Sequence, residues 1–183
     1  MRPAMTRSPQ CQPRATGCPR RWWMPVLLCG VAALLVPGVR ANPSPPGRQE
    51  APQSLPLSAR WCLDAQRCIL LEEPVGERQM AIGLQLRPPL PPLRGMWFRF
   101  SPPTPVRFWM HRTPSPLDML FVRDRQVVAI SAAAQPCMHL PCPTYGIAEP
   151  VDGVLELAAG QAQALGITIG TPVRIVPVST KEP

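Results

Sequence analysis

The sequence predicts a small, mainly β domain, a barrel or sandwich of short strands with one or two short helices. Apolar residues come in short runs separated by Pro, Gly or Asp, and several of these runs alternate with polar residues, which is typical of half-buried strands. The chain holds 28 prolines in 183 residues. Because proline interrupts helices and central strands, long helices are excluded and strands are confined between prolines.

Seven apolar runs are predicted to be strands. Alternation is clearest in residues 96–100 and 155–157, where every second side chain faces the core. Residues 123–126 separate two such runs and are predicted to form a hairpin loop. The predicted strands are residues 68–71, 95–100, 106–110, 119–122, 127–133, 154–157 and 173–176.

Two stretches have helical character. Residues 77–86 place Met80, Ala81 and Leu84 on one face, although Gly83 weakens this helix by about 1 kcal/mol. Residues 160–165 are rich in Ala and Gln and form a short turn that Gly166 can end in a left-handed conformation.

The first 41 residues have the layout of a secretory signal peptide. They hold six arginines and no acidic residue, followed by the apolar run 26–36 and by small residues at Val39 and Ala41, so we place cleavage after Ala41. The apolar run is shorter than the roughly 20 residues that span a bilayer. An uncleaved membrane anchor is the alternative, if Trp22, Trp23 and Pro25 extend the helix. The protein is therefore predicted to be exported to the periplasm.

The mature chain is predicted to contain a linker and one domain. Residues 42–58 are rich in proline and polar residues and are predicted to be a disordered linker, followed by a single β-rich domain at residues 59–178. Removing residues 1–41 leaves 13 of the 19 basic and all 11 acidic side chains. This near-neutral balance excludes the extended basic face of a non-specific nucleic-acid-binding protein.

Cleavage would leave four cysteines, for which two disulfides with three possible pairings are expected in an oxidising compartment. Our first choice is a local bridge between Cys62 and Cys68 across a hairpin. A local bridge between Cys137 and Cys142 would contribute about 2 kcal/mol by the loop-entropy model. The alternative is a soft-metal site for Cu or Zn formed by Cys137, His139 and Cys142. We favour the disulfides and expect no metal or cofactor.

Several ordered motifs resemble those of a known protein family. Residues 108–121 (Phe-Trp-Met-His-Arg-Thr-Pro-Ser-Pro-Leu-Asp-Met-Leu-Phe) are similar to its signature, and Glu77-Arg78, residues 83–87, residues 95–98 and residues 154–157 with the glycines after them also agree. The family that these motifs resemble is the "domain of unknown function 192" family, and the resemblance covers residues 60–176. It implies a single exported or membrane-anchored domain with a β-rich, barrel-like fold, and it carries no established activity.

The signature contains the residues best suited to chemistry. In a strand, Trp109, His111 and Thr113 would share one face, and Asp118 would turn back to orient His111 as a general base. In the structural alternative, Asp118 caps a turn, Thr113 satisfies backbone groups and Trp109 is part of the core.

Three further residues complete the predicted polar pocket. Arg87 is expected to bind an anionic ligand or to pair with Glu156 or Asp118, and the Tyr145 hydroxyl is expected to hydrogen-bond at a corner of the fold. The pocket as predicted comprises Arg87, Trp109, His111, Thr113, Asp118, Tyr145 and Glu156.

Three functions are compatible with these residues. The favoured one is a non-catalytic periplasmic binding or accessory protein whose polar pocket takes a small ligand or an envelope protein, and not nucleic acid. The second is an envelope hydrolase with His111 and Asp118 as acid and base. The third is a Cu or Zn protein using the second cysteine pair.

Overall fold

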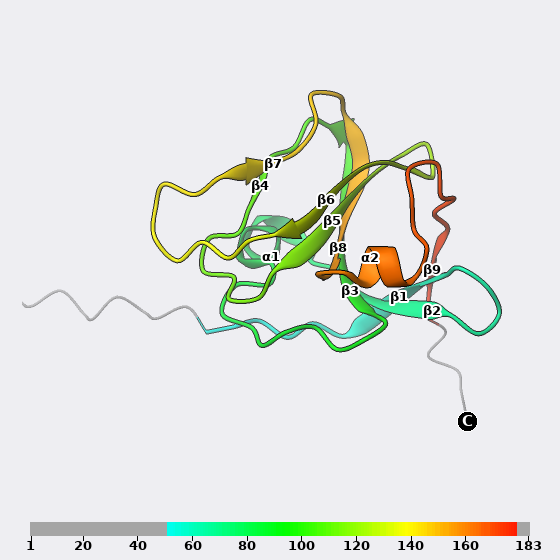
Figure 1. Ribbon diagram of the computed structural model, residues 1–183, viewed down its shortest axis with the longest axis horizontal. Coiled ribbons are helices and arrows are strands. Elements are labelled where there is room, and N and C mark those ends of the chain that lie inside the picture. The colour runs from blue at the N-terminus through cyan, green and yellow to red at the C-terminus, as the bar shows by residue number, and fades with distance from the viewer. Residues whose placement is uncertain (1–50, 179–183) are drawn as a thin grey trace, which may run out of the picture. The chain divides into compact units, whose positions relative to one another are not determined.

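The computed structural model describes residues 51–178, which form a mainly β unit with two short helices (Figure 1). A mixed seven-stranded sheet has the order β6-β5-β8-β3-β2-β1-β9, and β4 and β7 form a separate two-stranded sheet. The predicted signal peptide and residues 42–50 of the predicted linker lie outside the described residues. The predicted fold class is confirmed.

The strands and helices are short and follow the predicted runs closely. They are β1 (Leu57–Cys62), β2 (Cys68–Glu72), α1 (Gly76–Ile82), β3 (Arg94–Thr104), β4 (Phe108–Trp109), β5 (Leu117–Arg123), β6 (Gln126–Ala134), β7 (Thr144–Tyr145), β8 (Val151–Ala158), α2 (Gln161–Ala164) and β9 (Ile175–Pro177). Neighbouring strands are antiparallel except β2 and β3, and α1 lies in the crossover that a parallel pair requires. No helix within residues 51–178 is long and apolar enough to cross a bilayer.

The seven-stranded sheet is open, so the barrel alternative is wrong and the fold is sandwich-like. The segment before β9 lies along the edge strand β6, with hydrogen bonds from Val127 N to Thr171 O (3.0 Å) and from Val173 N to Arg125 O (2.8 Å). Pro172 lies between the two bonded residues of this segment and has no N–H to offer. The segment therefore covers the edge of β6 without adding a strand to the sheet.

The sheet buries both of its faces. One core contains Trp61, Leu71, Leu120 and Leu155 together with Ala162 of α2; we call this the α2 face. The other contains Met96, Met110, Met119, Phe121 and Leu84, which follows α1; we call this the α1 face. Because successive residues of a strand point to opposite faces, the side chains of the central strands β5 and β8 are almost all buried.

The predicted strand at residues 106–110 is reduced to two residues and is followed by a turn at Arg112. Only Phe108–Trp109 pairs, with β7, a two-residue strand that the sequence did not reveal. Beyond it Arg112 has a φ of 56°, and Thr113 N donates to Met110 O at 3.1 Å. Trp109, His111 and Thr113 therefore do not share one strand face.

Residues 51–58 of the predicted linker run beside α1 and β2. The Gln53 amide donates to the carbonyls of Gln79 and Gly83 at 2.9 Å each, and Leu55 N donates to the Glu72 carboxylate at 3.0 Å. Residues 57 and 58 already belong to β1. In the described structure the folded unit thus begins before residue 59.

Candidate functional site

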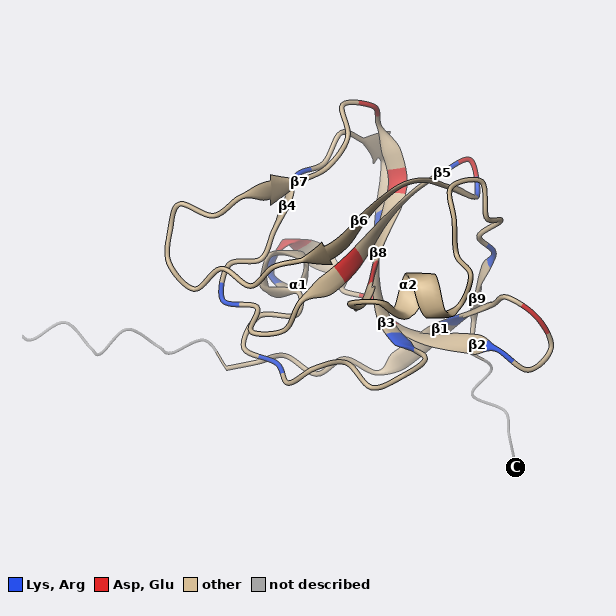
Figure 2. Cartoon of the chain, viewed as in Figure 1, with Lys and Arg blue, Asp and Glu red and all other residues tan. Residues whose placement is uncertain are grey.

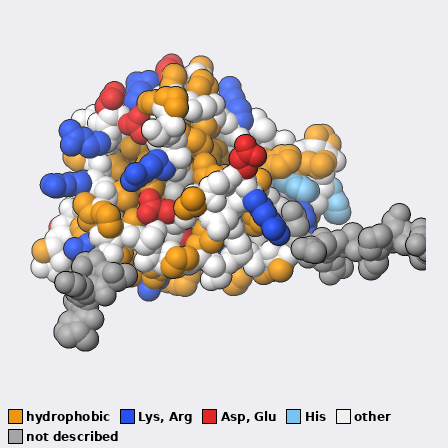
Figure 3. Space-filling model, turned by 180° about the vertical axis from the view of Figure 1, so that it is seen from behind, with side chains coloured by type: hydrophobic (Ala, Val, Ile, Leu, Met, Phe, Trp, Pro, Cys, Tyr) orange, Lys and Arg blue, Asp and Glu red, His pale blue; other side chains and the backbone are white. Residues whose placement is uncertain are grey.

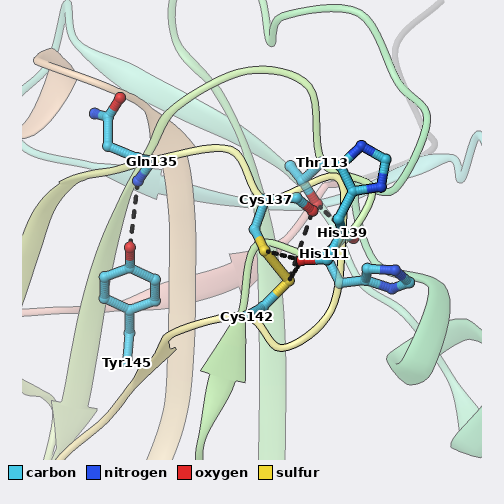
Figure 4. The surroundings of a disulfide bond; sticks show 7 residues. All are labelled: His111, Thr113, Gln135, Cys137, His139, Cys142 and Tyr145. Atoms are coloured by element: carbon cyan, nitrogen blue, oxygen red, sulfur yellow. Dashed lines mark hydrogen bonds between the residues drawn. A yellow bond between two sulfur atoms is a disulfide. The ribbon is translucent and has the colours of Figure 1, made fainter.

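Both local disulfides are present: one joins Cys62 and Cys68, and the other joins Cys137 and Cys142 (Figure 4). The second bond contradicts the soft-metal hypothesis, because both of the sulfur atoms proposed as ligands are bonded to each other. His139 lies in the exposed loop that this disulfide closes. Residues 51–178 contain no group of three or more His, Cys, Asp or Glu arranged to hold a metal ion.

The second disulfide holds the signature segment in place. Cys137 forms a β-bridge with His111, and its backbone carbonyl accepts a hydrogen bond from Arg112 N at 2.9 Å. Cys137 N donates in turn to Met110 O at 3.1 Å. Figure 4 shows His111 beside the disulfide loop that carries these contacts. The position of His111 therefore depends on the Cys137–Cys142 loop.

His111 lies in a pocket of about 260 Å³ between the signature segment and α1, which we call the His111 pocket. The imidazole packs against the Trp109 indole, with ring centroids 5.2 Å apart and a tilt of 47°. Trp109 is 47% exposed, which is unusual for so large an apolar side chain. The lining residues are Arg78, Ala81, Ile82, Gln85, Trp109, His111 and Arg112.

The lining of the His111 pocket is basic and aromatic. Arg78 and Arg112 contribute guanidinium groups, no carboxylate lines the pocket, and Arg78 forms no ion pair within residues 51–178. In the space-filling view, the histidines (pale blue) lie at the surface beside hydrophobic and basic side chains (Figure 3). Such a site offers donors to an anion and a flat apolar surface to an attached ring or hydrocarbon.

Asp118 lies on the α2 face, away from His111, which packs against α1. Its two carboxylate oxygens accept hydrogen bonds from Ala133 N at 2.9 Å and Ala162 N at 3.0 Å. Its neighbours Leu117 and Met119 point to the α1 face, as strand alternation requires. The predicted acid–base pair of His111 and Asp118 is therefore wrong.

Arg87 pairs with Glu72, which the sequence analysis missed, and not with Glu156 or Asp118. Its Nη1 and Nη2 donate to the two carboxylate oxygens at 2.7 and 2.8 Å, and the two side chains are only 15% and 9% exposed. This is the two-point geometry that favours arginine over lysine. The arginine ties the segment after α1 to the end of β2.

Glu156 is a buried carboxyl group without a complete set of partners. It lies in β8 opposite Met96 of β3 and Met119 of β5, and its Oε2 has no hydrogen-bond partner in the described structure. Burial raises its pKa to about 8, because desolvation disfavours the charged form. Glu156 does not line the His111 pocket.

The remaining predicted residues have local structural contacts. Thr113 is buried, and its hydroxyl donates to His111 O at 3.4 Å. The Tyr145 hydroxyl accepts a hydrogen bond from Gln135 N at 3.3 Å (Figure 4). Of the seven residues in the predicted pocket, the structure thus brings together Trp109 and His111.

Sequence reasoning missed the pocket residues contributed by α1 and the turn after it. Arg78, Ala81, Ile82 and Gln85 follow the spacing i, i+3, i+4 and i+7, which marks one face of a helix. That pattern was readable. The surface that faces these residues across the pocket could not be predicted, because its position depends on the turn at Arg112.

Comparisons with known proteins agree with this architecture. A family model, DUF192, described as "Uncharacterized ACR", matches residues 63–175. A crystal structure from Sinorhizobium meliloti 1021, provisionally labelled a transcription regulator, is 33% identical, with a TM-score of 0.56, over 66% of this chain and 92% of that one. A protein of unknown function from Novosphingobium aromaticivorans DSM 12444 is 31% identical, with a TM-score of 0.57, over 69% of this chain and 94% of that one.

No curated protein matches the chain. The family match covers more than half of the sequence and nearly all of the described residues. Both similar structures are themselves matched over almost their whole length. The chain belongs to the DUF192 family.

Proposed function

We propose that this protein is an exported, non-catalytic binding or accessory domain whose His111 pocket takes a small organic anion. One observation carries the proposal: the half-exposed Trp109 indole packs on His111 in a pocket that has two arginines and no carboxylate. An arginine fork recognises a carboxylate or a phosphate. The indole provides a flat apolar surface for the rest of the ligand.

The environment of His111 supports binding over catalysis. General acid–base catalysis needs a second group within hydrogen-bond reach of the reacting atoms. Asp118 is committed to two backbone donors on the α2 face, and Glu156 is buried away from the pocket lining. Among residues 51–178, no carboxylate is therefore placed to assist the imidazole.

Export is supported by the two disulfides together with the leader-like first 41 residues. Disulfides persist in oxidising compartments and are rare in the cytosol. A periplasmic location follows if the leader is cleaved after Ala41.

The charge balance argues against nucleic acid as the partner. Residues 51–178 hold 11 arginines, no lysine and 9 acidic residues, and charges of both signs are spread over the strands and turns (Figure 2). Nucleic-acid binding generally needs a clustered basic surface. The transcription-regulator label of the Sinorhizobium protein is therefore not carried over to this chain.

Binding is tested by following the indole N–H resonance of Trp109 in ¹H–¹⁵N NMR spectra. The probes are benzoate and glucuronate, with benzamide and glucose as their uncharged counterparts. We expect the anions to shift the Trp109 resonance at lower concentration than the neutral compounds, and Arg78→Gln to weaken the effect. Arg60→Gln, an exposed change outside the pocket, is the control. Equal responses to the charged and uncharged probes would contradict the proposal.

Export is tested by mass spectrometry of the protein recovered from a bacterial periplasmic extract. A mature chain that begins at Asn42 and contains both disulfides is expected. A chain that begins at Met1 and is found in the cytosol with free thiols would contradict the proposed location.

A further inference from the structure

Another hollow lies beside the Trp97 side chain. Trp97 is 5% exposed and lies opposite Leu155 of β8. Its six-membered ring lies over Gly153, where any Cβ would collide with the indole. The glycine therefore leaves the space that the indole occupies.

The Trp97 hollow has a volume of about 170 Å³ and is formed by four separate segments. Arg99 comes from β3, Arg125 from the β5–β6 turn, Asp152 from β8 and Arg174 from the segment that leads into β9. Figure 2 shows basic positions at that turn and on that segment. Aliphatic side chains complete the lining: Val122, Val173 and Ile175.

Three arginines line the hollow without a close ion pair to any carboxylate within residues 51–178. Trp97 Nε1 is buried and has no partner in the described structure, although most buried indole N–H groups find one. Within residues 51–178, Arg125 and Arg174 form no ion pair, and Arg99 approaches a carboxylate only at 4.0 Å, that of Glu73. The one carboxylate in the lining, Asp152, accepts a hydrogen bond from Asp124 N at 2.6 Å.

We propose that the Trp97 hollow is a binding site for a short-chain carboxylate. The carboxylate oxygens would accept hydrogen bonds from the arginines. The hydrocarbon chain would lie against the aliphatic side chains. The apolar lining favours an organic acid over a bare inorganic anion, because an inorganic anion would leave that surface uncovered.

This site is separate from the His111 pocket. The two pockets share no lining residue. Loss of binding at one site therefore leaves the other testable.

The test is an NMR titration of the full exported chain with butyrate, followed at the indole N–H resonance of Trp97. Butanol and inorganic phosphate are the comparison probes. We expect butyrate to shift this resonance at lower concentration than either. Arg174→Gln should raise the dissociation constant of butyrate about tenfold, as loss of one charge-assisted hydrogen bond implies. Arg60→Gln should leave the dissociation constant unchanged.

Trp97→Phe keeps an aromatic ring beside the hollow but makes it smaller, which changes the shape of the lining. If the variant is folded, as judged by its amide spectrum, we expect the butyrate-dependent shifts of Val122 and Val173 to weaken. If the variant does not fold, the proposal is tested by the butyrate titrations of the wild type and of Arg174→Gln. The proposal is overturned if butyrate does not shift Trp97, if phosphate or butanol shifts it equally, or if Arg174→Gln binds butyrate like the wild type.

Discussion

Asp118 joins β5 to α2 by accepting a hydrogen bond from Ala162 N at 3.0 Å. Its other carboxylate oxygen accepts one from Ala133 N at 2.9 Å, at the end of β6. One buried side chain thus satisfies backbone donors of two neighbouring elements. The Pro-Leu-Asp part of the signature is therefore explained by folding and not by chemistry at His111.

Asp118→Asn should destabilise the fold without affecting the His111 pocket. The amide replaces one acceptor with a donor that faces a backbone N–H, and an unsatisfied buried donor costs about 1–3 kcal/mol. We expect a corresponding drop in the free energy of unfolding measured in urea, with anion binding to the His111 pocket retained. Unchanged stability accompanied by lost binding would contradict this role.

Glu156 should make the protein less stable as the pH rises. Its pKa is about 8 in the folded chain against the ordinary 4.5 of a glutamate side chain, so between these values the unfolded chain releases a proton that the folded chain keeps. The free energy of unfolding then falls by roughly 1.4 kcal/mol per pH unit from this group alone. Its stabilising contribution is complete below pH 4.5 and lost as the pH rises to about 8.

Glu156→Gln removes this titration and should flatten the pH dependence. Urea unfolding at pH 5, 6.5 and 8 would measure this pH dependence of the free energy of unfolding for both proteins. The free energy of unfolding of the variant, relative to that of the wild type, is expected to increase as the pH rises, and at pH 8 the variant should be the more stable protein. Parallel curves for the two proteins would mean that Glu156 titrates normally in the folded state.

The Glu72–Arg87 pair should be strongly coupled. Removing one partner leaves a buried charge without its counterion, which typically costs about 3–5 kcal/mol. Glu72→Gln and Arg87→Met should each cost an amount in this range, and the double variant should cost less than the sum of the two. A double-mutant cycle in urea measures this coupling, and simple additivity would show that the pair contributes nothing jointly.

The two disulfides should differ in their effect on binding. Replacing Cys137 and Cys142 with serine should cost about 2 kcal/mol and loosen the segment that holds His111. Faster amide hydrogen exchange at Arg112 and weaker anion binding are expected. The matched variant, with serine at Cys62 and Cys68, should lose comparable stability but keep its binding. Equal losses of binding in both variants would show a general effect of stability.

The fold was largely predictable because its signals are local. Alternating apolar runs and breaker residues located most strands, and the short separations within each cysteine pair favoured local bridges. Whether the sheet closes into a barrel or stays open was not predictable from the sequence. It depends on how the segment around Pro172 meets β6, a contact between residues far apart in sequence.

The site was predictable only in part. Trp109 and His111 were identified from the signature, but their relation to Asp118 was wrong because it assumed a continuous strand. The left-handed conformation of Arg112 ends that strand. The sequence gives no sign of it, because the residue is not a glycine or an asparagine. Glu72 was missed as the partner of Arg87 because ion pairs between distant segments leave no spacing pattern.

The central claim, that the His111 pocket binds a small organic anion, is tested most directly by calorimetric titration of benzoate into the wild type, Arg78→Gln and Arg60→Gln. We predict that Arg78→Gln raises the dissociation constant about tenfold and that Arg60→Gln leaves it within error of the wild type. Equal dissociation constants for the three proteins, or no measurable heat with the wild type, would contradict the account.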